Sequence, residues 1–285
     1  MSFSVSIGIP VYNEEKNIGN LLNYIHNSKF DFELKEILVV CSGCTDKSVE
    51  IVKSWSKKER KIRILVEKTR EGKFSAINKI LKQSHGNYII LIDADTLPKR
   101  NSLNELIKPF TNPSIGAVSG RPLPIRSNSS IVSYFQYFIW TLNHEISFSF
   151  NKLNGEICAI KKDLVKEVPE KIINDDAFLA AKISLTHNIA YQQKAESIRI
   201  EKLDFNGYVK KRRRIAQGFK QLSQLGFNAV IPMPLIVKHV IRRITKEPQK
   251  IFYIVLAVMV ETYCNILAFF DIRKGNLDYK WNKLN

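Results

Sequence analysis

The chain has 285 residues, of which 45% are apolar, so it can bury a large core and is too apolar for a disordered polypeptide. Its formal charge is +17, and residues 202–250 hold twelve Lys and Arg against two acids. Such a basic block attracts anionic lipid, nucleic acid or a phosphorylated substrate. The opening MSFSVSIGIPVYNEE lacks a basic segment followed by an apolar one, so we expect no signal peptide and a cytosolic catalytic part.

The first two thirds of the chain alternate short β-rich apolar runs with amphipathic helical patterns. Strands are predicted at residues 3–12, 36–42, 62–68, 88–96 and 115–122. Helices are predicted at residues 14–28, 45–58, 73–84 and 102–110. This alternation predicts an α/β domain with a mostly parallel sheet covered by helices on both faces. Ligands of such sheets bind at the carboxyl ends of the strands.

Four polar segments follow these strands or lie between elements: PVYNEE, SGCTDKS, EGK and DADT. We expect all four at one edge of the sheet. Within DADT, Asp93 and Asp95 end a run whose other residues are apolar. A helix cap or a turn would explain one such acid, but the neighbouring polar segments favour a binding site. Carboxylate oxygens suit Mg²⁺ or Mn²⁺, and Mg²⁺ is often shared with substrate phosphates.

The cysteines do not indicate a structural zinc site. Cys41 and Cys44 form one C-x-x-C, whereas a structural zinc needs two further ligands, usually as a second close pair. Cys158 and Cys264 are isolated in the sequence. We therefore expect reduced cysteines with structural roles.

The order IPVYNEEKNI, VVCSGCTDKSVEIV, REGKFSAIN and IILIDADT resembles the family-2 glycosyltransferases over roughly residues 5–200. That resemblance implies a GT-A fold, a nucleotide-diphosphate-sugar donor, a divalent metal and a hydroxyl acceptor on a lipid or glycan. It also implies an inverting enzyme at the cytosolic membrane face. The catalytic domain would span residues 1–200, followed by a membrane-associating helical tail over residues 201–285.

The resemblance assigns the metal chiefly to Asp95, with Asp93 meeting the metal through water or the ribose. The residues that it assigns to the nucleotide-sugar pocket are Pro10, Tyr12, Glu14, Ser42, Asp46, Gly72, Lys73, Asn78, Asp93 and Arg214. Tyr12 would lie against the base. Backbone N–H groups at Gly72, with Lys73, suit a phosphate at a helix start. A proline turn, a helix cap at Asp46 and a solvated lysine are the alternatives.

Two adjacent acids, Asp175 and Asp176, begin an apolar helical pattern in KIINDDAFLAAKI. They stand where inverting members carry Glu-Asp, so Asp176 is expected to take the acceptor proton. The alternative is a helix N-terminus stabilised by two acids. Upstream, Gly155 in NKLNGEICAIKKDLV resembles the family's acceptor-side strand, where glycine permits close approach.

The segment VKKRRRIAQG, residues 209–218, resembles the Gln-x-x-Arg-Trp-x-x-Gly stretch of processive members. Arg214 and Gly218 match, but Lys211 replaces Gln and Ile215 replaces the Trp that would stack on the acceptor sugar. The segment therefore does not indicate a polymerising enzyme. Its arginines either contact phosphate or form a solvated basic run.

Two helical patterns near the C-terminus indicate a membrane surface. LIVKHVIRRIT, residues 235–245, is amphipathic, with Lys238, His239, Arg242 and Arg243 expected on the face opposite its aliphatic residues. Residues 251–270 carry a single charge, Glu261. A spanning helix, an in-plane helix and a packed helix all remain open for this run. A further aromatic stretch at residues 131–148 would shield a lipid acceptor or belong to the core.

Two other functions are compatible with parts of this sequence. One is a scaffold of the same fold that binds sugar nucleotides with little turnover, because Ser42, Lys211 and Ile215 depart from the family pattern. The other is a basic membrane- or nucleic-acid-binding protein. The basic residues alternate with aliphatic ones instead of exposed aromatics, so no nucleic-acid partner is expected.

Overall fold

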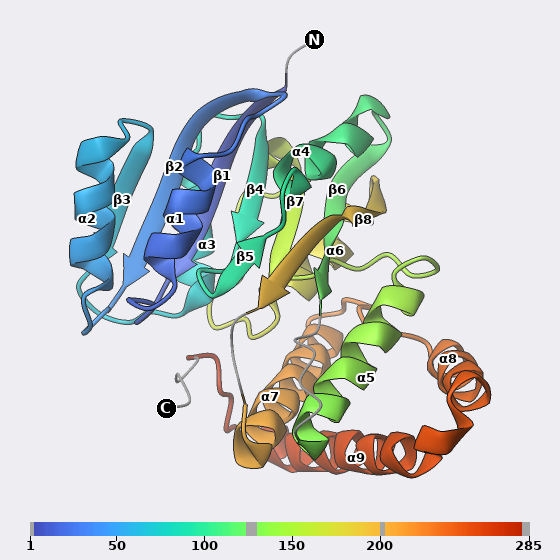
Figure 1. Ribbon diagram of the computed structural model, residues 1–285. Helices are drawn as coiled ribbons and strands as arrows, with labels where there is room; N and C mark the ends of the chain where they lie inside the picture. The colour runs from blue at the N-terminus through green and yellow to red at the C-terminus, as the bar shows by residue number, and fades with distance from the viewer. Residues whose placement is uncertain (1–2, 124–129, 200–202, 281–285) are drawn as a thin grey trace.

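The structure is a computed structural model that describes residues 3–123, 130–199 and 203–280. Within those residues, an eight-stranded sheet carries helices on both faces, and a layer of longer helices lies beyond the carboxyl ends of the first strands (Figure 1). The predicted α/β class is confirmed. The two layers meet at the sheet edge where the polar segments were expected.

The strands are arranged in the order β3-β2-β1-β4-β7-β6-β8-β5. Their bounds are β1 (Ser4–Val11), β2 (Glu33–Ser42), β3 (Ile62–Glu67), β4 (Tyr88–Ile92), β5 (Thr96–Pro98), β6 (Ile115–Leu123), β7 (Ile157–Lys161) and β8 (Asn188–Arg199). Strands β1 to β4 pair in parallel, whereas β7 is antiparallel to both β4 and β6. The sheet is therefore mixed: β1 to β4 form one parallel block, and β6 and β8 form a second parallel pair.

The predicted strand at 88–96 is divided by its two acids. β4 ends at Ile92, and β5 begins at Thr96 and pairs with β8. In the turn between them, the Thr96 N–H donates to the carbonyl of Asp93 at 3.0 Å. The break places both carboxylates beyond the core because burying an unpaired charge is costly.

Helices cover both faces of the sheet. One face carries α1 (Ile18–His26), α2 (Ser48–Lys58) and α4 (Ser102–Ile107), and the other carries α3 (Lys73–Gln83) and α6 (Asp175–Ile183). The apolar stripe predicted for α1 is buried as expected, and each such aliphatic side chain contributes about 1.5–3 kcal/mol. These packed helices fix where α3 and α6 begin, at the carboxyl edge of the sheet.

The helical layer combines segments that are distant in sequence. It contains α5 (Ile131–Ile146), α7 (Phe205–Gln224), α8 (Met233–Lys246) and α9 (Ile251–Arg273). Helix α5 comes from the middle of the chain, yet it packs against α8 and α9 (Figure 1). Short 3₁₀ turns are η1 (Lys108–Thr111), η2 (Lys162–Leu164) and η3 (Pro248–Lys250). The helical layer therefore contains residues from both sides of residue 200, where the sequence suggested a domain boundary.

Polar contacts join α7 to α9. The Arg212 guanidinium lies 2.8 Å from the Glu261 carboxylate, to which the Tyr208 hydroxyl also donates at 2.7 Å. The next residue of α7, Arg213, pairs with Asp271 near the C-terminal end of α9. The one charge within the apolar run of α9 therefore faces its neighbouring helix and not solvent.

The faces predicted for α8 need a correction. His239 is buried against Glu145 of α5, with the ring nitrogen 3.0 Å from the carboxylate. Arg243 donates to the Tyr137 hydroxyl at 2.9 Å. The sequence placed these two residues with Lys238 and Arg242 on a basic face suited to a membrane surface; instead they face inward, because α5 offers polar partners there. Conversely, the apolar Val237 and Ile241 of α8 are exposed.

Helix α9 presents an apolar outer face. One helix of the described chain, Pro248–Arg273, is long and apolar enough by length and composition to cross a membrane. Only about a quarter of its most apolar window is buried in the protein. Exposed large apolar residues on it are Ile251, Phe252, Tyr253, Val255, Val258, Met259, Tyr263, Ile266, Phe269 and Phe270. So large an apolar surface indicates a lipid or protein partner.

Candidate functional site

Two adjoining cavities lie between the sheet edge and the helical layer. The smaller has a volume of about 210 Å³ and the larger about 550 Å³. They share five lining residues: Glu156, Asn174, Asp176, Lys211 and Ile215. A molecule in one cavity can therefore touch a molecule in the other at this junction.

The smaller cavity gathers most of the residues singled out in the sequence. Those that line it are Pro10, Tyr12, Glu14, Ser42, Gly72, Lys73, Asp93, Asp95, Gly155, Asp175, Asp176 and Arg214. They lie at or just after the ends of β1, β2 and β4, shortly before β7, at the starts of α3 and α6, or on α7. They converge because parallel strands end at one edge of a sheet.

Two predicted pocket residues lie elsewhere in the structure. The Asp46 carboxylate accepts hydrogen bonds from the N–H groups of Glu15 and Ser48 at 3.0 and 2.9 Å, so it orders a loop and the start of α2. The Asn78 side chain bonds both the N–H and the carbonyl of Val168, at 2.7 and 2.9 Å. Neither lines the smaller cavity. The alternative interpretation of Asp46, a helix cap, therefore accounts for its contacts.

Lys73 joins the two acidic motifs. Its ammonium lies 2.7 Å from an Asp93 carboxylate oxygen and 3.3 Å from one of Asp175. Burial alone would lower the pKa of Lys73, but Asp175 and Asp93 outweigh it and raise the pKa. Gly72, with φ of 117°, makes the turn that aims this side chain across the cavity. Lys73 is therefore charged and links β4, α3 and α6.

Asp95 has a different cationic partner. The Arg199 guanidinium at the end of β8 lies 2.9 Å from Asp95 and 3.0 Å from Glu156. Burial raises the pKa of Asp95, but Arg199 and then Lys211 outweigh it, and the net pKa is lowered. Asp95 is accordingly ionised near neutral pH. Arg199 and Glu156 escaped the sequence analysis; Glu156 is next to Gly155, but Arg199 gives no local signal.

Two acids of the smaller cavity, Asp93 and Asp176, have raised pKa values. Burial raises the pKa of Asp93 to about 6, with Lys73 acting in the opposite direction. Burial, followed by the neighbouring Asp175 carboxylate, raises the pKa of Asp176 to about 6. A carboxylate with a pKa close to the working pH is suited to accepting a proton.

Gly155 lies directly against Asp176. A Cβ atom added at Gly155 would stand 3.2 Å from an Asp176 carboxylate oxygen, tighter than ordinary contact. The other Asp176 oxygen accepts from the N–H of Ala177 at 2.8 Å. Glycine at 155 therefore leaves space beside the carboxylate, in agreement with its predicted position.

The end of the smaller cavity near Tyr12 contains an arrangement that the sequence did not predict. The guanidinium of Arg70 stacks on the ring of Tyr12, with 3.8 Å from its carbon to the ring centroid. Both residues line the smaller cavity. Arg70 lies in the quoted REGK segment, but nothing in the local sequence indicates the contact.

The donor set fits a hard divalent cation. Asp93 and Asp95 both line the cavity, and oxygen ligands are those that Mg²⁺ and Mn²⁺ prefer. In residues 3–123, 130–199 and 203–280, no three His, Cys, Asp or Glu side chains cluster as a self-sufficient metal site. Mg²⁺ typically uses one or two carboxylates together with substrate phosphates, and two are present here.

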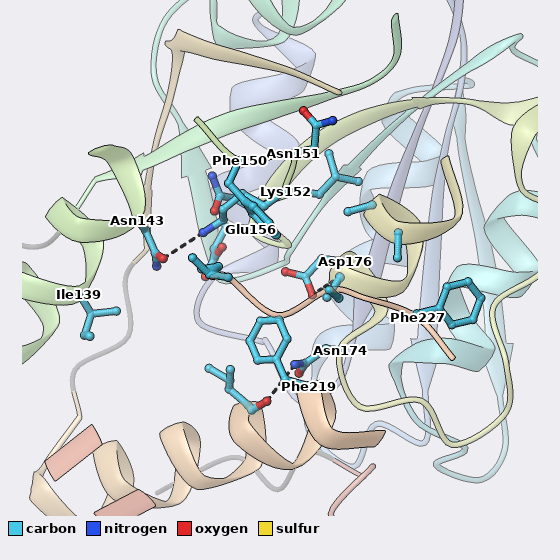
Figure 2. A pocket seen from close by; sticks show the side chains of 18 of the residues that line it. Ile139, Asn143, Phe150, Asn151, Lys152, Glu156, Asn174, Asp176, Phe219 and Phe227 are labelled. Carbon is cyan, nitrogen blue, oxygen red and sulfur yellow. Dashed lines mark hydrogen bonds between the residues drawn. The ribbon is translucent and has the colours of Figure 1, made fainter. Parts of the chain in front are cut away.

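The larger cavity opens between α5, α6 and α7 (Figure 2). Figure 2 shows Asp176 projecting into it, with Lys152 and Glu156 on one side and Phe219 and Phe227 on the other. Lys152 donates to the Asn143 side chain at 3.0 Å. Asp176 is thus accessible from both cavities.

Comparison with known proteins connects this geometry to an activity. The family model described as Glycosyl transferase family 2 matches residues 6–159. The poly-β-1,6-N-acetyl-D-glucosamine synthase of Staphylococcus epidermidis is 26% identical over 226 residues, 75% of this chain and 54% of that protein. The synthase of Staphylococcus aureus is 28% identical over 223 residues, which make up 74% of this chain and 53% of that protein. The chain spans about half the length of these relatives.

Solved structures share the fold. The mannosyltransferase PcManGT from Pyrobaculum calidifontis, in complex with GDP-Man and Mn²⁺, superposes with a TM-score of 0.71 at 21% identity, covering 95% of this chain and 87% of that one. Glucosyl-3-phosphoglycerate synthase from Mycobacterium tuberculosis, in complex with Mn²⁺, UDP and glucosyl-3-phosphoglycerate, superposes with a TM-score of 0.57 at 19% identity. That match covers 79% of this chain and 81% of the other. The expected GT-A fold is confirmed by this likeness.

The raised pKa of Asp176 leads to a stability prediction. The folded state holds this proton more tightly than the unfolded chain, so the stability that the group supplies below pH 4 is lost as pH rises through about 6. Asp176→Asn should therefore raise the free energy of unfolding by about 1–3 kcal/mol at pH 7.5 and change it little at pH 4. Denaturant unfolding at both pH values measures this.

The matched control is Asp31→Asn, which alters an exposed carboxylate away from the cavities. It should not change the difference in stability between the two pH values. An Asp176→Asn protein that is less stable than the wild type at pH 7.5 would contradict the raised pKa of Asp176.

Proposed function

We propose, starting from the fact that the chain belongs to glycosyl transferase family 2, that it transfers a sugar from a nucleotide-diphosphate sugar to an acceptor hydroxyl with inversion. The observation that carries the proposal is the position of Asp176 at the junction of the two cavities. One cavity offers cations and metal-binding oxygens to a diphosphate. The other offers space for an acceptor.

The donor is proposed to occupy the smaller cavity. Its diphosphate would lie near Lys73, Arg214 and the N-terminus of α3, where backbone N–H groups and positive charge favour phosphate. Asp95 and Asp93 would hold a divalent metal, which neutralises charge on the leaving diphosphate when bound. The base would lie near the Tyr12 and Arg70 pair.

The acceptor is proposed to approach from the larger cavity. Its oxygen attacks the anomeric carbon on the side opposite the diphosphate, Asp176 takes the hydroxyl proton, and the sugar–phosphate bond breaks to release the nucleoside diphosphate. Because the pKa of Asp176 is about 6, most of this carboxylate is ionised at neutral pH and is still basic enough to accept a proton. Asp175, paired with Lys73, would orient the start of α6.

We also propose that the helical layer attaches the enzyme to the cytosolic face of a membrane. Polar groups of α8 and α9 point inward to α5 and α7, whereas their outer faces are apolar. Exposed Lys238, Arg242 and Lys246 on α8 flank this surface and suit anionic headgroups. Because Glu261 and Asp271 hold α9 along α7, an in-plane helix is favoured over a spanning one.

The donor assignment predicts the effect of Asp95→Asn. This change removes one charge from the proposed metal site, so Mn²⁺-dependent binding of nucleotide sugar should fall at least about tenfold while the fold is retained. Calorimetry with a panel of nucleotide sugars, with and without Mn²⁺, measures it. The control is Asp46→Asn, outside the cavity. Equal metal-dependent binding by Asp95→Asn and wild type would refute the assignment.

The base assignment predicts that Asp176→Asn lowers turnover about 10²–10⁴-fold, the usual contribution of a positioned proton acceptor. Donor affinity should barely change, because this carboxylate acts on the acceptor. Asp175→Asn should have a milder effect. Release of nucleoside diphosphate at saturating acceptor measures turnover and also separates an enzyme from a sugar-nucleotide-binding scaffold. If both variants keep near-normal turnover, the two acids serve only the helix start.

The in-plane orientation predicts that both ends of α9 are accessible from the catalytic side of the membrane. In a Cys44→Ser background, Gln249→Cys and Lys274→Cys should react with an impermeant maleimide from the same side of sealed vesicles as the control Asp31→Cys. All three positions are exposed in the protein. Labelling of positions 249 and 274 from opposite sides would show that α9 crosses the bilayer.

A further inference from the structure

The wall of the larger cavity is mostly carbon. Helix α5 contributes Ile139 and Trp140, α7 contributes Phe219, and α6 contributes several small apolar residues. Other apolar lining residues are Phe150, Leu153, Ala177, Ala180, Ala181, Leu185, Ile215, Phe227, Ala229 and Ile231. Such a surface favours an aliphatic ligand, because each apolar group that it covers is removed from water.

Polar groups of the same wall are largely engaged within the protein. The Asn154 amide donates to the carbonyl of Gly120 at 2.7 Å, and the Asn174 amide donates to that of Ile215 at 2.9 Å. A chain of sugars would bury many hydroxyl groups here with few partners, and unpaired buried polar groups are costly. The wall therefore disfavours a glycan as the main occupant.

One cation stands in this wall without a carboxylate partner. The Lys152 ammonium bonds the Asn143 side chain at 3.0 Å and forms no salt bridge among the described residues, although the Asp176 and Glu156 carboxylates act on it electrostatically from farther away. Burial lowers the pKa of Lys152 to about 8, so the ammonium form still predominates at neutral pH. Arg212, by contrast, is neutralised by Glu261. Lys152 thus offers its remaining N–H donors to an anion in the cavity.

The rim of the cavity is apolar and lies next to the proposed membrane surface. Leu185 lines the cavity and is 69% exposed, and Leu225 and Val230 flank its lining loop and are also exposed. The cavity lies between α5 and α7, which pack in turn against α8 and α9. The helices α5 and α7 that border the cavity therefore belong to the layer that is proposed to attach to the membrane.

We infer that the larger cavity is the acceptor site and that the acceptor is an anionic amphiphile, an inference that rests on the proposed function. Its aliphatic body lies against the carbon wall. An anionic group, phosphate or carboxylate, pairs with Lys152. Its accepting oxygen lies at Asp176, at the junction with the donor cavity.

Tryptophan fluorescence can test this assignment directly. The chain has three tryptophans, so Trp55→Phe with Trp281→Phe leaves Trp140, in the cavity wall, as the only one. The probe is 8-bromooctyl phosphate, whose bromine quenches indole on contact. We expect saturable quenching in the full-length protein. Inorganic phosphate, as a competitor, should not relieve it, because it lacks the aliphatic body.

Two substitutions test the contributions of the apolar wall and of Lys152 to binding separately. Ala181→Phe fills the cavity and should weaken binding at least about tenfold, whereas Thr186→Phe, exposed beyond the same helix and outside the lining, should not. Lys152→Met should weaken the binding of 8-bromooctyl phosphate about tenfold, which is the effect of one charge-assisted hydrogen bond. The same substitution should leave the binding of 8-bromo-1-octanol nearly unchanged. Non-specific partition into lipid would affect all variants alike.

The inference is overturned if quenching does not saturate, if Thr186→Phe weakens binding as much as Ala181→Phe, or if Lys152→Met leaves the phosphate probe unaffected. Nucleoside diphosphate release is measured on the same preparation with its native tryptophans. An active protein without saturable quenching refutes the acceptor class alone. A protein that binds the probe but releases no nucleoside diphosphate with any donor and metal refutes the proposed function instead.

Discussion

Crowded carboxylates at the carboxyl ends of the strands can share one small cavity only because buried cations separate them. Lys73 lies between Asp93 and Asp175, and Arg199 lies between Asp95 and Glu156. These contacts connect β4, α3, α6 and β8, so they fix the sheet edge against the helices. Burial and the neighbouring Asp175 carboxylate raise the pKa of Asp176, and the opposing effect of Lys73 is smaller. The same charge balance that closes the fold thus leaves one carboxylate able to accept a proton.

In the helical layer, polar groups face inward and apolar groups face outward, which is the reverse of the arrangement in most water-soluble proteins. Its ion pairs, such as Arg212 with Glu261 and Arg213 with Asp271, face other helices, while large apolar side chains face outward. In water, an apolar surface of this size would favour association. Against lipid, inward pairing satisfies the charged groups, and the outer face remains in contact with hydrocarbon. The arrangement therefore supports a membrane-facing layer and explains why a charge occurs in the middle of α9.

The two cavities differ in chemistry although they share a wall. The smaller cavity, proposed for the donor, has acids and bases in near balance, whereas the larger cavity, proposed for the acceptor, is mostly carbon with Lys152 in its wall. Lys211 and Ile215, where the chain departs from the pattern of processive members, stand at the junction. With Ile215 in place of an aromatic ring, the junction lacks a stacking surface for sugar and keeps an aliphatic one. This local change agrees with an acceptor unlike a growing polysaccharide.

The sequence by itself determined the α/β class, the positions of β1 to β4 and β6, and the set of polar loops, because periodicity and strand-terminal acids are local properties. It also identified most residues of the smaller cavity through their resemblance to a family. Only the tertiary structure placed Arg199 on Asp95, turned Asn78 toward Val168, and brought α5 into the helical layer. It likewise decided that His239 and Arg243 face inward. These outcomes depend on partners that are distant in the chain, whose presence no local pattern encodes.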